Sequence, residues 1–168
     1  MWKRHRKQSY GLVLEGEKLT VHAAAQPGLF DPRFLIAALL HHVAAGDGRV
    51  CEREDIAMVE LVADHLGLDT MEAESRLGQA LNLYSQSLDL AAVGEVLQDI
   101  LDEQERIEVM LMLLHVVAAD GRQGADELRA VDEVAASLQI TDEERHLAFQ
   151  HYFDEQDEHR SRQRIHQQ

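Results

Sequence analysis

Cysteine, proline and positive charge are all scarce in this 168-residue chain, and each shortage narrows what the protein can be. The single cysteine excludes a disulfide framework and a metal cage of cysteines alone, and it fits a reducing compartment. Two prolines and ten glycines argue against a loop-rich or collagen-like chain. Lys and Arg number 16 against 31 Asp and Glu, a net charge of −15. We therefore expect no general affinity for nucleic acid phosphates.

Long apolar runs are also missing. The longest, from Val109 to Ala119, contains His115 and falls short of the roughly 20 residues that span a bilayer. It is typical of a buried core helix. The basic start of the chain is not followed by the apolar stretch of a secretory signal, so we expect neither a membrane span nor a targeting segment.

Residues 1–30 form a basic leader that differs from the rest of the chain. Residues 1–31 hold five basic and three acidic residues, whereas the remainder holds eleven and twenty-eight. The segments Leu-Val-Leu at 12–14 and Leu-Thr-Val at 19–21 flank four polar or glycine residues, which suits a small hairpin. An isolated hairpin is marginally stable, so the leader is expected to be either loosely ordered or a hairpin. Its charges and Trp2 allow at most weak contact with a membrane surface or an acidic partner, and a solvated terminus is the alternative.

From residue 31 onward the spacing of apolar residues predicts helices. Asp89 is a candidate N-cap, Gly67 a candidate C-cap, and Thr141 with Glu144 a capping box. About seven helices are expected, near residues 34–45, 52–65, 70–84, 90–100, 103–119 and 125–138 and after 141. We predict one all-α domain over residues 31–153, followed by a polar tail at 154–168 that is frayed or disordered.

The chain contains an internal repeat at an offset of 73 residues. Residues 40–63 match residues 113–136 at 11 of 24 positions without a gap. Each copy has an apolar helix, an Asp-Gly turn and an amphipathic helix. Two copies are too few for a solenoid, so we predict a single bundle with pseudo-twofold symmetry between about 34–63 and 107–136.

The repeated motif resembles the signatures of TerB-like, tellurite-resistance-associated domains. The first copy is LLHHVAAGDGRV at residues 39–50 followed by Glu54, and the second is LHVVAADGR at 114–122 followed by Glu127. The resemblance covers about residues 33–150. It implies a helical fold of about seven helices and a cytoplasmic, stress-associated protein, with divalent-cation binding as one role and protein interaction as another. Cys51 and Gly124 depart from the usual Ser, Thr or Asp N-cap, which weakens both capping boxes.

The acidic residues of the motif have two interpretations. Asp47 and Asp120 can accept backbone N–H groups at the helix that follows each turn, a structural role. Alternatively, Asp47, Glu54, Asp120 and Glu127 come together as a metal site. Carboxylate ligands suit Ca²⁺, Mg²⁺ or Mn²⁺, although neither loop has the ligand spacing of an EF-hand.

His42 and His115 occupy equivalent places in the two copies and are weaker metal candidates. Each lies five residues before its Asp, about 140° around a helix, so His and Asp point to different faces. A buried, hydrogen-bonded histidine is the simpler interpretation, and zinc ligation needs further ligands. Cys51 has no evident catalytic partner, although a thiol in a first helical turn is a candidate for redox chemistry.

These patterns lead to three functional hypotheses. The first is a non-enzymatic, stress-associated binding module whose acidic Asp-Gly loops hold a divalent cation. The second is a scaffold domain with no metal site that binds a protein partner not identified by the sequence. The third is a metal-dependent enzyme, which the absence of any phosphate loop or nucleophile motif disfavours.

Overall fold

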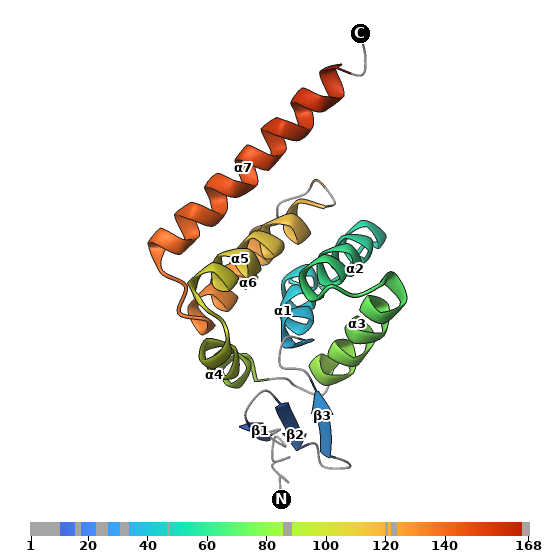
Figure 1. Ribbon diagram of the computed structural model, residues 1–168, viewed down its shortest axis with the longest axis vertical. Coiled ribbons are helices and arrows are strands. Elements are labelled where there is room, and N and C mark those ends of the chain that lie inside the picture. The colour runs from blue at the N-terminus through green and yellow to red at the C-terminus, as the bar shows by residue number, and fades with distance from the viewer. Residues whose placement is uncertain are drawn as a thin grey trace, which may run out of the picture.

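A small antiparallel sheet and seven helices make up the part of the chain that the structure, a computed structural model, describes (Figure 1). That part comprises residues 11–15, 18–22, 27–30, 34–46, 48–85, 89–119, 121 and 124–165. In chain order the elements are β1 (Gly11–Glu15), β2 (Lys18–His22), β3 (Pro27–Phe30), α1 (Phe34–Ala44), α2 (Glu52–Leu66), α3 (Thr70–Ser85), α4 (Leu90–Ile100), α5 (Glu103–Ala118), α6 (Ala125–Ser137) and α7 (Asp142–Ile165). The expected bundle of about seven helices is confirmed. The division into leader, domain and tail stays a prediction.

The described part of the leader contains three strands in the order β1-β2-β3. Leu12 pairs with Val21 and Leu14 with Leu19, so β1 and β2 form the hairpin that was one of the two alternatives. The third strand was not predicted, because adjacent proline and glycine, here Pro27 and Gly28, are typical of a turn or loop. Proline is tolerated at the first residue of an edge strand, which is where Pro27 lies. The sheet rests against α4 through β1.

The core is centred on two helices that are apolar over most of their surface. α1 contacts α2, α3, α5 and α6. α5 contacts α1, α2, α6 and α7. Their buried residues are Leu35 to Leu40, Val43 and Ala44 on α1, and Ile107, Val109, Met110, Met112, Leu113, Leu114, Val116 and Val117 on α5. In Figure 1, α2 and α3 lie on one side of α1, while α4, α5 and α6 lie on the other. The buried residues of the two helices form one continuous apolar core together with residues of α2, α3, α4, α6 and α7.

The helix boundaries follow local hydrogen-bond chemistry. Gly67 ends α2 in the left-handed conformation, with φ of 64°. The Asp89 carboxylate accepts the Ala91 N–H at 3.0 Å and begins α4. Thr141 and Glu144 exchange hydrogen bonds at 2.7 and 3.2 Å, as a capping box requires. All three of these predicted signals are confirmed.

The expectation that residues 154–165 are frayed or disordered is wrong. α7 continues to Ile165, and its C-terminal half projects beyond the bundle in Figure 1. The segment is rich in Glu, Gln and Arg, which are good helix formers. Pairs one turn apart add support, with Arg162 3.4 Å from Glu158 and Arg160 3.7 Å from Asp157. Residues 166–168 of the predicted tail lie outside the described part.

Candidate functional site

The two glutamates of the repeated motif are buried at helix beginnings. Glu54 Oε2 accepts the Cys51 N–H at 2.6 Å, and Glu127 Oε2 accepts the Gly124 N–H at 3.1 Å. Each residue is only 2% exposed. The Cys51 side chain makes no cap hydrogen bond, and Gly124 has no side chain to make one. The glutamate half of each capping box is therefore present and accounts for these carboxylates without a metal.

Both Asp-Gly turns have the same backbone conformation at their glycines. Gly48 and Gly121 have φ of 87° and 75°, a region that favours glycine. Asp47 and Asp120 themselves lie outside the described residues. The first turn packs against the second copy of the motif, because a Cβ on Gly46 would lie 3.0 Å from the Glu127 Cα. A side chain larger than hydrogen is therefore poorly accommodated at Gly46.

The four-carboxylate metal site stays a prediction. Among the described residues, no three His, Cys, Asp or Glu side chains are grouped so that they could hold a metal ion. Glu54 and Glu127 belong to that described part, whereas the two aspartates do not. The structure thus assigns a capping contact to half of the predicted ligands and does not test the other half.

His42 and His115 each pair with a glutamate. His42 Nε2 lies 3.3 Å from Glu133 Oε2 on α6, and His115 Nε2 lies 2.8 Å from Glu155 Oε2 on α7. The His115 ring also meets Tyr152 edge-on, with centroids 5.1 Å apart. Both rings are therefore hydrogen-bonded, as the structural interpretation predicted, but they are only partly buried and not buried as it also predicted.

The neighbouring His41 has a depressed pKa. Burial of the ring lowers its pKa most, the negative charge of Asp55 opposes this by raising it, and His42 lowers it further. The neutral imidazole is therefore favoured in the folded chain.

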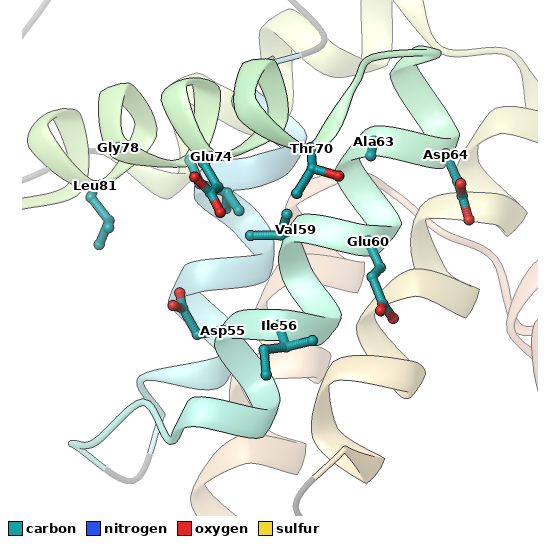
Figure 2. Close-up of a pocket in the computed structure, with 11 residues that line it drawn as sticks. Asp55, Ile56, Val59, Glu60, Ala63, Asp64, Thr70, Glu74, Gly78 and Leu81 are labelled. Atoms are coloured by element: carbon teal, nitrogen blue, oxygen red, sulfur yellow. The ribbon is translucent and has the colours of Figure 1, made fainter.

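A groove between α2 and α3 is the feature that sequence reasoning missed. Its volume is about 730 Å³. Figure 2 shows the two helices diverging from the end where Thr70 and Ala63 lie close together, with Leu81 and Ile56 toward the open end. Its lining residues are Asp55, Ile56, Val59, Glu60, Ala63, Asp64, Thr70, Glu74, Leu77, Gly78 and Leu81. The same surface therefore combines an apolar floor with carboxylates.

The groove exposes apolar side chains that lie on helix faces whose spacing predicts burial in the core. Ile56 is 52% exposed and Leu81 is 38% exposed, whereas Leu77 is buried. Both stripes were visible in the sequence, with Ile56 and Val59 on one helix and Leu77 and Leu81 on the other. Helical periodicity identifies an apolar face but not which part of it another element covers. Only the divergence of α2 from α3 decides that.

Comparison with known protein families now identifies the chain. A family model for tellurite resistance protein TerB matches residues 33–150. The chain belongs to the TerB family. No curated protein and no solved structure shows a significant similarity to it.

The TerB match covers α1 to α6 and the first part of α7, and so includes both motifs and the groove. The strands of the leader and the projecting end of α7 lie outside it. Among the described residues, no helix is both long and apolar enough to cross a membrane.

Proposed function

We propose that this TerB-family chain is a non-enzymatic, cytoplasmic module that acts by binding another protein. The α2–α3 groove carries the proposal. The groove is concave, and the side chains of Ile56 and Leu81 that line it are exposed to solvent. An exposed apolar concavity flanked by polar residues is typical of a binding site. The absence of nucleophile and phosphate-loop motifs in the sequence supports binding rather than catalysis.

Filling the groove tests this proposal. A Cβ added to Gly78 would meet no atom within 4 Å, so a larger side chain can occupy the groove without disturbing the helix. The immobilised 168-residue chain, its Gly78→Leu variant and the matched Gly78→Ala control are exposed to extract of the native source. We expect at least one protein to be retained by the parent chain and by Gly78→Ala but lost from Gly78→Leu. Identical retention by all three, with their melting midpoints preserved, would contradict the proposal.

A divalent cation at the Asp-Gly turns is a second candidate function. The observation that favours it is the packing of Gly46 against the Glu127 backbone, since Asp47 is the next residue in the chain. A carboxylate offers about four lone-pair positions, and the Cys51 donor uses one of those on Glu54. Asp47, Glu54, Asp120 and Glu127 would supply hard oxygen ligands suited to Ca²⁺, Mg²⁺ or Mn²⁺.

Thermal melting distinguishes this candidate from a scaffold without metal. The chelator-stripped chain is melted alone and with Ca²⁺, Mg²⁺, Mn²⁺ or Zn²⁺. A cation that binds only the folded chain adds about 2.7 kcal/mol at a hundred times its dissociation constant. This gain should vanish in Asp47→Asn/Asp120→Asn and persist in a control, Asp99→Asn/Asp154→Asn, at exposed positions outside the motif. No shift with any ion at millimolar concentration would exclude the cation site.

A further inference from the structure

The α2–α3 groove is acidic as well as apolar. Four of its lining residues are carboxylates and none is basic: Asp55, Glu60, Asp64 and Glu74. All four are exposed. Within the described residues none of the four is in an ion pair, and Asp55 has an electrostatic contact with the His41 ring, whose neutral form is favoured. The two arginines of these helices, Arg53 and Arg76, do not line the groove. Unneutralised negative charge around an apolar floor is complementary to a ligand that is both apolar and cationic.

We propose that the α2–α3 groove binds a basic amphipathic helix of another protein. The inference rests on the proposed function, because it assigns the chemistry of the partner to the same groove. Leucine-like side chains of the partner would pack on Val59 and on Ile56 and Leu81 at the open end of the groove. Its Lys and Arg side chains would lie along the carboxylates.

The walls of the groove favour a helix over an extended peptide. Both walls are helices, whose backbone N–H and C=O groups are already paired within each helix. An extended segment would find no sheet edge here and would bury its own backbone groups unpaired, which is costly. A helix satisfies its backbone internally. The lining of α3 extends from Thr70 to Leu81, about 17 Å, which matches roughly three turns of a bound helix.

The charge of the whole chain argues against a second copy as the occupant. The groove and the chain have the same sign of charge, since the net charge is −15. Two copies facing each other through this surface would bring carboxylates together without compensation. A basic segment of a different protein would instead be attracted by the negative charge of the groove and of the chain.

The test uses a defined peptide and the 168-residue chain. The probe is a helical peptide of about 18 leucines and lysines, with leucines at i, i+3, i+4 and i+7. Fluorescence anisotropy at about 0.15 M salt measures its affinity. We expect the charge-reversed variant Glu60→Lys/Glu74→Lys to bind about tenfold more weakly and Gly78→Leu to lose binding. A peptide of the same composition with scrambled order, which has no apolar face, should bind at least about tenfold more weakly than the probe.

A matched control separates the groove from the net charge. Glu95→Lys/Asp99→Lys makes the same change in charge on α4, at exposed positions outside the groove, and should keep the affinity of the parent chain within about twofold. Equal losses in the two reversal variants, or equal binding of the scrambled peptide, would overturn the proposal, because binding would then follow total charge. Failure of the peptide while the extract experiment still yields a partner lost in Gly78→Leu would overturn only the assigned chemistry. Failure of both experiments would overturn the proposed function as well.

Discussion

At the residue scale, the described part of the chain buries three carboxylates, and each accepts a backbone N–H at a helix beginning. They are Glu54, Glu127 and Glu144, which are 2%, 2% and 3% exposed. Burying a charge is costly unless it is hydrogen-bonded. Each of these residues accepts the N–H of the residue three positions earlier, at 2.6, 3.1 and 2.7 Å. The backbone hydrogen bond therefore explains how each of these charges is tolerated in a buried position.

Glu144 has a second partner, and removing it should be costly. The Arg106 guanidinium lies 2.7 Å from Glu144 Oε1. In Arg106→Ala the buried carboxylate keeps its charge without that partner, so we expect the free energy of unfolding to fall by about 2–3 kcal/mol. Urea unfolding measures this. Arg145→Ala, which breaks the exposed pair with Asp132, is the control and should cost less than about 1 kcal/mol. Equal costs for the two variants would show that the Arg106 contact adds nothing beyond a surface pair.

The same pair predicts a response to acid. Burial alone would raise the pKa of Glu144, but hydrogen bonds from Thr141 and the Arg106 guanidinium outweigh it and hold the pKa below its ordinary value of 4.5. Its contribution to stability is therefore complete above pH 4.5 and is lost as the pH falls through the lower folded pKa. The Glu144→Gln variant should lose less stability than the parent chain over that acidic range, measured by melting at successive pH values. Parallel curves would contradict this.

His41 predicts a separate pH dependence nearer neutrality. Its pKa in the folded chain lies below the ordinary 6.5, so the unfolded chain binds the proton more tightly. The free energy of unfolding should therefore fall as the pH drops below about 6.5. His41→Gln should reduce the loss between about pH 7.5 and pH 5.5, whereas His159→Gln, at an exposed position on α7, should not. Urea unfolding at the two pH values compares the variants, and an unchanged slope in His41→Gln would refute the assignment.

At the element scale, two helical glycines have opposite surroundings. A Cβ on Gly94 of α4 would collide with the Ser137 carbonyl oxygen at the end of α6, whereas one on Gly78 of α3 would meet nothing within 4 Å. Gly94→Ala should therefore destabilise the chain by about 1–3 kcal/mol, because the two helices would have to separate. Gly78→Ala should stabilise it by up to about 1 kcal/mol, since alanine is the better helix former. Thermal melting should move in opposite directions, and the same sign for both would contradict the packing.

The elements show where prediction from sequence succeeds. Gly67, Asp89 and the Thr141–Glu144 box marked helix boundaries correctly, because capping depends on atoms within a few residues of one another. The end of α7 was not predicted, because a polar segment without an apolar stripe has no periodic pattern that indicates a helix. β3 was not predicted because its first residue is a proline, which is more typical of a turn or loop than of a strand.

The apolar stripes were harder to interpret than the boundaries. The apolar spacing of α2 and α3 places Ile56 and Met71 on helix faces that are typical of a core, yet these residues are 52% and 79% exposed. Periodicity places residues on one face, and the crossing of neighbouring helices decides which of them are covered. The groove exists because that covering is incomplete along α2 and α3.

At the scale of the whole molecule, charge of one sign dominates. With a net charge of −15 on one small chain, the negative charges repel one another in the folded state and lower its stability. Added salt screens this repulsion, because the Debye length falls from about 30 Å at 0.01 M to about 8 Å at 0.15 M. We expect the melting midpoint to rise by about 2–4 °C over this range, roughly 1 kcal/mol. A fall in the midpoint would show that ion pairs outweigh the repulsion.

The sequence by itself determined the helical class, most helix boundaries and the TerB motif, because each depends on spacing and contacts that are local in the chain. It also placed Glu54 and Glu127 in two capping boxes, both weakened by the residue at the N-cap, and among the candidate metal ligands. Only the tertiary structure decided which apolar residues stay exposed, that His42 and His115 have glutamate partners on α6 and α7, and that α2 and α3 diverge to leave an acidic groove. Those features depend on how helices far apart in sequence cross, and that crossing follows from packing the whole core at once.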